Sequence, residues 1–185
     1  MGTIYTIGHG TRSTRDLVAV LSAAGVGRLI DVRRFPGSRR HPHLSREALE
    51  VDLPGAGIGY EWRGEHLGGR RSTRGGPTRH PAWRNQGFRS YADFMDTRTF
   101  RDALIELEAE AGSSPPAAIM CAETLWWKCH RRLISDALTL RGTQVVHLVG
   151  LHERQSHKLH PSARAEQDGW PVYDLGETSE LNLDA

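Results

Sequence analysis

The sequence predicts an α/β fold: a single domain with a mostly parallel β-sheet and helices on both faces, in a Rossmann-like three-layer arrangement. Short apolar segments alternate along the chain with amphipathic segments of helical period, which is the pattern of βαβ units. The length of 185 residues suits one domain, and we find no internal repeat and no linker. The expected domain therefore spans residues 1–185.

The N-terminal half alternates strand, helix, strand, helix and strand. Ser13, with Asp16 three residues later, forms a capping box for the first helix, and Gly25 ends that helix. Ser45 is the expected cap of the second helix. The expected ranges are 3–8, 14–24, 28–32, 46–53 and 58–62.

Residues 63–87 show neither a helical nor a strand period and contain six glycines and six arginines. A segment of this length without secondary structure is usually functional or disordered in a compact domain. We therefore expect a long Arg/Gly-rich loop, mobile or extended, that lies beside the binding site as a flap.

The C-terminal half continues the alternation after this loop. Phe100, Leu104 and Leu107 follow one another at helical spacing on one face of a helix that begins near Thr97. The tail from His152 is polar, with one expected edge strand. The expected ranges are helices at 88–95, from 97, and 129–140, and strands at 117–121, 144–149 and 171–175.

The net charge of +2 hides an asymmetry between the two halves. Residues 28–89 hold 13 arginines against 6 acidic residues, whereas residues 90–185 hold 9 basic against 15 acidic residues. This clustering predicts a basic face suited to phosphate or carboxylate. The alternative is that these arginines are solvated or paired internally.

Composition and patterning exclude several classes of protein. No apolar stretch approaches the ~20 residues of a membrane span. The first residues lack the basic and apolar regions of a secretion signal, so we expect a cytoplasmic protein. Two cysteines, Cys121 and Cys129, cannot form a disulfide framework.

Titratable residues follow the ends of three expected strands. His9 follows the first strand, Asp31 and Arg33 end the second, and Cys121 and Glu123 end the strand at 117–121. Ligands of open parallel sheets bind at the carboxyl ends of the strands. We therefore expect these side chains to share one pocket, although Asp31 could instead pair with Arg33 or cap a turn.

A basic segment opens the helix expected at 129–140. Lys128, His130 and Arg131 lie at this helix start, where the dipole disfavours cations unless an anion compensates them. The same position should lower the pKa of the Cys129 thiol. Alternatively, Cys121 and Cys129 are small buried side chains without reactivity.

Several motifs carry a resemblance to a known family. The segments are Thr6–Gly10, Asp31–Arg39, His66–Arg71, Trp83–Asn85, Phe88–Ala92, Met120–Glu123, Cys129–Arg132, His147 and His157–Pro161. Over nearly its whole length the chain resembles the uncharacterised prokaryotic family called domain of unknown function 488, with His66 at a position where we expect an acidic residue. The resemblance implies an α/β fold and brings no reaction.

These observations predict an enzyme, or an enzyme-like domain, that binds a phosphate-bearing ligand such as a nucleotide or nucleic acid at the strand ends. No cofactor and no metal ligand is assigned. Arginines would clamp phosphate and aromatic residues would stack on bases, unless those aromatics belong to the core. The candidate catalytic residues are His9, Asp31, Cys121, Glu123 and His130; the candidate ligand-binding residues are Arg33, Arg39, Arg131, Tyr60, Trp83, Arg84 and Tyr91.

Three alternatives stay open. Cys121 or Cys129 could act as a nucleophile activated by His130. The same three residues, with His9, could bind a metal such as zinc. A non-catalytic nucleic-acid-binding accessory domain would use only the basic loop and would leave His9, Asp31 and Glu123 without a role.

Overall fold

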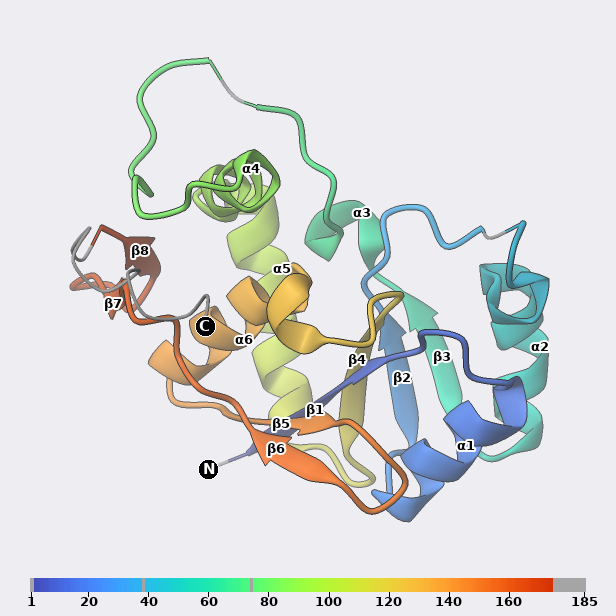
Figure 1. The fold of residues 1–185 in the computed structure, drawn as a ribbon. Helices are drawn as coiled ribbons and strands as arrows, with labels where there is room; N and C mark the ends of the chain where they lie inside the picture. Colours follow the sequence, from blue (N-terminus) through green and yellow to red (C-terminus); the bar gives the residue numbers. More distant parts are fainter. Residues whose placement is uncertain (1, 38, 74, 175–185) are drawn as a thin grey trace, which may run out of the picture.

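A six-stranded sheet forms the centre of the protein, in the order β3-β2-β4-β1-β5-β6 (Figure 1). This computed structural model describes residues 2–37, 39–73 and 75–174. The first five strands of that order are parallel, and β6 is antiparallel to β5. The strands are β1 (Thr3–Gly8), β2 (Arg28–Asp31), β3 (Gly59–Trp62), β4 (Ala117–Cys121), β5 (Gln144–Leu148) and β6 (Arg154–Ser156).

Helices cover both faces of this sheet, and the alternation of side chains along the strands separates the two cores. In β2, Leu29 packs in the core beneath α1 and α2, whereas its neighbour Ile30 packs in the core on the opposite face. The expected three-layer α/β fold is thus confirmed. The helices are α1 (Thr14–Ala23) and α2 (Arg46–Gly55) on one face, and α4 (Gln86–Met95), α5 (Arg98–Ala109) and α6 (Arg131–Leu140) on the other (Figure 1).

Both expected helix caps form. The Ser13 side chain accepts a hydrogen bond from the Asp16 amide at 3.1 Å, and the Ser45 side chain accepts one from the Ala48 amide at 3.3 Å. Short helical turns fill the connections: η1 (Pro42–Leu44), α3 (Gly64–Leu67), η2 (Glu110–Gly112) and η3 (Trp126–Lys128).

The tail differs from the expectation. The strand expected at 171–175 is β8 (Pro171–Tyr173), which pairs with β7 (Ala163–Ala165) in a separate hairpin and not with the main sheet; residue 175 lies outside the described residues. The two edge strands of the main sheet are β3 and β6, and β6 lies in a segment that the sequence predicted only to be a polar tail. Its three residues are all exposed, so no alternation of polar and apolar residues marked them as a strand.

The loop expected at 63–87 is shorter than the sequence suggested. Helix α3 occupies its start and α4 begins at Gln86, which leaves a coil from Gly68 to Asn85. Within that coil Trp83 is buried, and His80 contacts Asp96 at 3.1 Å. The Arg34 guanidinium also donates to the Arg70 carbonyl at 2.8 Å, so the coil is attached to the domain near both of its ends.

No helix among the described residues combines the length and the apolar character that crossing a membrane requires.

Candidate functional site

The carboxyl ends of β1, β2 and β4 meet at one edge of the sheet because these strands are neighbours and parallel. The His9 amide donates to the Cys121 carbonyl at 2.9 Å, which continues the β1–β4 pairing beyond β1. Gly8 permits this close approach, since a Cβ there would lie 2.0 Å from the Glu123 carbonyl oxygen. Glycine at position 8 thus brings the two strand ends together.

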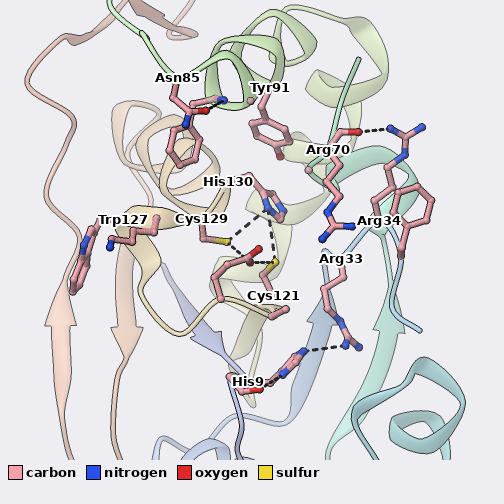
Figure 2. A pocket seen from close by; sticks show the side chains of 18 of the residues that line it. His9, Arg33, Arg34, Arg70, Asn85, Tyr91, Cys121, Trp127, Cys129 and His130 are labelled. Atoms are coloured by element: carbon pink, nitrogen blue, oxygen red, sulfur yellow. Dashed lines mark hydrogen bonds between the residues drawn. The ribbon is translucent and has the colours of Figure 1, made fainter. Parts of the chain in front are cut away.

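A pocket of about 840 Å³ opens at these strand ends. Figure 2 shows its lining, which comes from the segments that follow β1 and β2, from the end of β4, from the coil after α3, from α4 and from the residues just before α6. Six of the candidate residues named from the sequence line it: His9, Arg33, Tyr91, Cys121, Glu123 and His130. Asp31 does not line the pocket and lies fully buried below it.

Asp31 and Arg33 form a buried ion pair. The Asp31 carboxylate accepts from the Arg33 guanidinium at 2.5 to 3.0 Å, and also from the Arg33 amide and the Tyr60 hydroxyl. The pKa of Tyr60 is raised by burial and by the negative charge of Asp31, which keeps its hydroxyl a donor. This is the internal pairing that the sequence left open, and it gives Asp31 and Tyr60 the role of positioning Arg33.

His9 is neutral and has partners at both ring nitrogens. Burial and the adjacent charge of Arg33 lower the pKa of His9 to about 4. The Arg33 guanidinium donates to Nε2 at 3.1 Å, so Nδ1 carries the proton and donates to the Gly10 carbonyl at 3.0 Å. His9 therefore fixes the pocket floor, and proton transfer through it would first require loss of one of these bonds.

Four side chains from β4 and the segment before α6 form one wall of the pocket, which we call the thiol cluster: Cys121, Glu123, Cys129 and His130. Each offers one donor atom, and these atoms all lie within 4.8 Å of one another. Such a set could hold a metal ion. Both cysteines are buried free thiols, whereas Glu123 is exposed to the pocket.

The surroundings of the two thiols differ. A hydrogen bond with Cys129, burial and the nearby negative charges of Cys129 and Glu123 raise the pKa of Cys121. Burial alone would raise the pKa of Cys129 too, but the hydrogen bond with Cys121 and the charges of His130 and Arg131 outweigh it and lower the pKa well below the ordinary value. The pKa values of the two thiols are thus shifted in opposite directions.

Helix α6 begins two residues later than expected. Trp126–Lys128 form a 3-10 turn, Cys129 is extended with φ −126° and ψ 150°, and His130 is the N-cap residue. The Cys129 sulfur accepts from the Arg131 amide at 3.4 Å and so satisfies one of the free amides of the first helical turn. Cys129 therefore caps the helix from outside it.

Arg131 is buried and fully engaged inside the protein, so it does not line the pocket. Its guanidinium donates to the Glu123 carbonyl, to the Cys129 sulfur and to Thr6 Oγ1. The Thr6 hydroxyl in turn lies 2.7 Å from His147 Nδ1, within hydrogen-bond distance. The Arg131 charge is thus compensated by protein groups.

A buried polar chain that the sequence did not reveal continues from Thr6. His147 Nε2 lies 3.0 Å from His157 Nδ1, and His157 Nε2 lies 2.8 Å from the buried Asp136 carboxylate. Trp126 stacks on the His147 ring at a centroid distance of 4.2 Å. A polar residue within the buried face of α6, Asp136, was the available signal for this chain.

The other candidate ligand-binding residues lie apart from the pocket or in the core. Trp83 and Tyr91 are buried, and the Tyr91 hydroxyl donates to the Leu67 carbonyl at 2.6 Å, although its ring reaches the lining. Trp83 is therefore a core residue, as the alternative from the sequence stated, whereas Tyr91 is a core residue that also borders the pocket. Arg39 and Arg84 are exposed and do not line the pocket.

The exposed cations and aromatics on the pocket rim are not among the ligand-binding candidates chosen from the sequence, although Lys128 was noted as part of the basic helix start. Arg34, Arg70 and Lys128 line the pocket, and none forms an ion pair with a carboxylate in the part of the chain that the structure describes. Phe35 and Trp127 line it with 63% and 40% exposure. Four of them lie within two positions of Arg33 or Cys129 in the sequence, which was the available signal; nothing in the sequence marked Arg70.

Comparison with known proteins gives one match. The model of the family "Domain of unknown function DUF488" matches residues 13–138, which include the thiol cluster and exclude His9. No curated protein and no solved structure matches the chain.

Proposed function

The chain belongs to the DUF488 family, and because that membership brings no reaction, we propose from the site itself that the protein is an enzyme or enzyme-like domain that binds a phosphate-bearing ligand, a nucleotide or a segment of nucleic acid. The observation that carries the proposal is the pocket rim, where Arg34, Arg70 and Lys128 have no carboxylate partner among the described residues. An anionic ligand would complete them.

The geometry of the flap supports a ligand at this rim. The Arg34 guanidinium donates to the Arg70 carbonyl at 2.8 Å, and Arg70 has a φ of 55°, a conformation that is costly for residues other than glycine. Strained residues of this kind concentrate at binding sites, where surrounding contacts hold them in place. Arg34 therefore holds Arg70 where its side chain borders the pocket.

The exposed aromatics favour a ligand that carries a base. Phe35 and Trp127 present ring surface at the pocket, and stacking of a base on an aromatic ring contributes about 1–3 kcal/mol. A bound nucleotide would place its phosphate at the cations and its base on an aromatic ring, next to the thiol cluster. We place the reacting side of the pocket at the thiol cluster, where Glu123 is exposed.

The proposal includes a reducing, cytoplasmic setting. In such a setting Cys121 and Cys129, which lie in the same wall of the pocket, would be kept as free thiols.

The test is equilibrium binding of inorganic phosphate, nucleotides and short single-stranded DNA and RNA at two salt concentrations. Arg34→Ala and Lys128→Ala should each weaken binding of every phosphate-bearing probe by about tenfold, the loss of one charged hydrogen bond. Trp127→Ala should weaken nucleotide binding and leave inorganic phosphate unchanged. Arg98→Ala, which removes an exposed arginine of α5 that does not line the pocket, is the matched control.

Affinity should also fall as salt rises, because counterions compete for the rim cations. Preference for single strands over mononucleotides would identify the ligand as nucleic acid. Absence of binding by every probe, or equal losses in Arg98→Ala, would refute the proposal. Arg33 and Arg131 are unsuitable test positions, because both are buried and bonded internally.

A further inference from the structure

The thiol cluster has the composition and spacing of a tetrahedral metal site. His130 Nδ1 lies 3.8 Å from the Cys121 sulfur and 3.7 Å from the Cys129 sulfur. In a tetrahedral zinc site with ordinary bond lengths, the sulfur and nitrogen ligands are separated by about 3.6 Å. Both sulfur–nitrogen distances therefore already match those of a zinc site.

Glu123 completes the set of four. Its carboxylate Oε2 lies 2.8 Å from the Cys121 sulfur and 3.2 Å from the Cys129 sulfur, which is closer than two zinc ligands stand. The carboxylate would therefore move outward by roughly half an ångström on metal binding. The exposed position of Glu123 allows that movement, whereas the buried sulfurs would stay in place.

The tautomer of His130 supports a metal ligand at Nδ1. His130 Nε2 lies 3.2 Å from the Val32 carbonyl, which accepts hydrogen bonds and cannot donate them. In neutral His130 the proton therefore sits on Nε2, and the Nδ1 lone pair faces the two sulfurs. Metal-binding histidines typically donate their other N–H to a backbone carbonyl or a carboxylate in this way.

The surroundings also provide for the charge of a metal-bound cluster. Two thiolates and one carboxylate around Zn²⁺ carry a net charge of −1. Arg131, buried beside the cluster, donates to the Cys129 sulfur from both its side-chain Nε and its backbone amide, each at 3.4 Å. These two donors would stabilise a coordinated thiolate as hydrogen bonds of the outer shell do in zinc sites.

We propose that Cys121, Cys129 and His130 bind one Zn²⁺ per chain, with Glu123 as the fourth ligand. Binding forms two Zn–S bonds, and any proton still on a thiol is released to solvent. Thiolate sulfur and imidazole nitrogen favour zinc over magnesium or calcium, which prefer oxygen. The carboxylate is the exchangeable ligand, because it alone is exposed, and its departure would open one coordination position toward the pocket.

Cobalt provides a direct test in the unmodified chain. Metal-free protein, prepared under reducing conditions with a chelator that is then removed, is titrated with Co²⁺. The proposal predicts saturation at one equivalent, intense visible bands of tetrahedral cobalt and a thiolate-to-cobalt charge-transfer band. Since the chain has only two cysteines, that band identifies Cys121 and Cys129 without any substitution. Subsequent Zn²⁺ should displace the cobalt and abolish the bands.

Variants then assign the ligands. Cys121→Ser and Cys129→Ser should each weaken the charge-transfer band and lower zinc affinity by at least a hundredfold. Glu123→Gln should still bind one equivalent, because three ligands remain. His152→Asn, which changes an exposed histidine outside the cluster, should match the unmodified protein. Circular dichroism confirms that each variant is folded before it is compared.

A chain that takes up no Co²⁺ or Zn²⁺, or that gives no charge-transfer band at saturation, would overturn the proposal. The inference concerns the same pocket as the proposed function but does not depend on it, because the titration needs no nucleotide. If the unmodified protein binds nucleotide but no zinc, the result counts against the metal site alone. The reverse result counts against the phosphate-bearing ligand alone.

Discussion

At the scale of single residues, the Asp31–Arg33 pair shows how a charge is kept below a pocket. Asp31 is fully buried and receives hydrogen bonds from Arg33 and Tyr60. Removal of one member of such a pair leaves the other charge uncompensated, which costs more than the pair itself contributes. The pair therefore holds Arg33 in place at the pocket floor, even though Asp31 does not line the pocket.

Asp31→Asn should accordingly destabilise the fold by about 3–5 kcal/mol, the cost of an unpaired buried charge. Urea unfolding followed by tryptophan fluorescence measures this loss. Glu50→Gln is the control, since Glu50 pairs with Arg46 on the surface, where an ion pair contributes only about 0.5 kcal/mol. Similar losses in the two variants would contradict the assignment of Asp31 as a structural partner.

The buried His147 predicts a pH dependence of stability. Burial, followed by the neighbouring His157 and Arg131, lowers the pKa of His147 from 6.5 to about 3. Below pH 6.5 the unfolded chain thus binds a proton at His147 that the folded chain does not accept. The contribution of neutral His147 to the free energy of unfolding is therefore present in full above pH 6.5 and is lost as the pH falls toward 3. Between pH 7 and pH 5 the loss amounts to about 2 kcal/mol.

His147→Gln should be less stable at pH 7 but should lose about 2 kcal/mol less than the unmodified protein between pH 7 and pH 5. Denaturant unfolding at the two pH values, with a chelator present, measures the difference. An unchanged decline in His147→Gln, with the same decline in His152→Gln, would show that His147 is not the group that titrates.

At the scale of elements, the ends of the strands were predictable because each strand is short and apolar and is followed by a titratable residue. The sequence predicted β1 and β4 with the boundaries found, and with them the places of His9, Cys121 and Glu123. It did not predict that Arg33 folds back onto Asp31, since the direction of a long side chain after a strand depends on tertiary contacts. The sequence also placed the start of α6 two residues too early. Cys129 is extended, but the pattern of polar and apolar residues does not distinguish it from the helical residues that follow.

The coil from Gly68 to Asn85 borders the pocket, and its described residues form no helix or strand. The Arg34 guanidinium donates to the Arg70 carbonyl at the start of the coil, and His80 contacts Asp96 near its end. The Arg70 side chain itself is exposed at the pocket rim. Limited trypsin digestion should therefore cut first after Arg70 or Arg71, and a bound phosphate ligand should slow the cut at Arg70. Initial cleavage within α5 or α6 would contradict the flap assignment.

At the scale of the whole molecule, the basic residues fall into two groups: those that form ion pairs with carboxylates and those that border the pocket. Arg63, Arg79 and Arg141 pair with carboxylates in the body of the domain, whereas Arg34, Arg70 and Lys128 at the pocket rim form no ion pair within residues 2–37, 39–73 and 75–174. Composition indicated a basic face but could not separate these two groups, because the separation depends on which carboxylates the fold brings near. That is why the sequence located the pocket better than its ligand-contacting residues.

The order of the strands has a consequence for synthesis of the chain. β4 lies between β1 and β2 in the sheet, yet it is made more than a hundred residues after β1 begins. Until β4 leaves the ribosome, β1 has neither of its sheet partners and β2 has only β3, so backbone N–H and C=O groups along their edges stay unpaired. Domains whose contacts join distant segments fold slowly and late. β1 and β2 can therefore join one sheet only once the five residues of β4 have been made, and the pocket at the ends of these three strands forms no earlier.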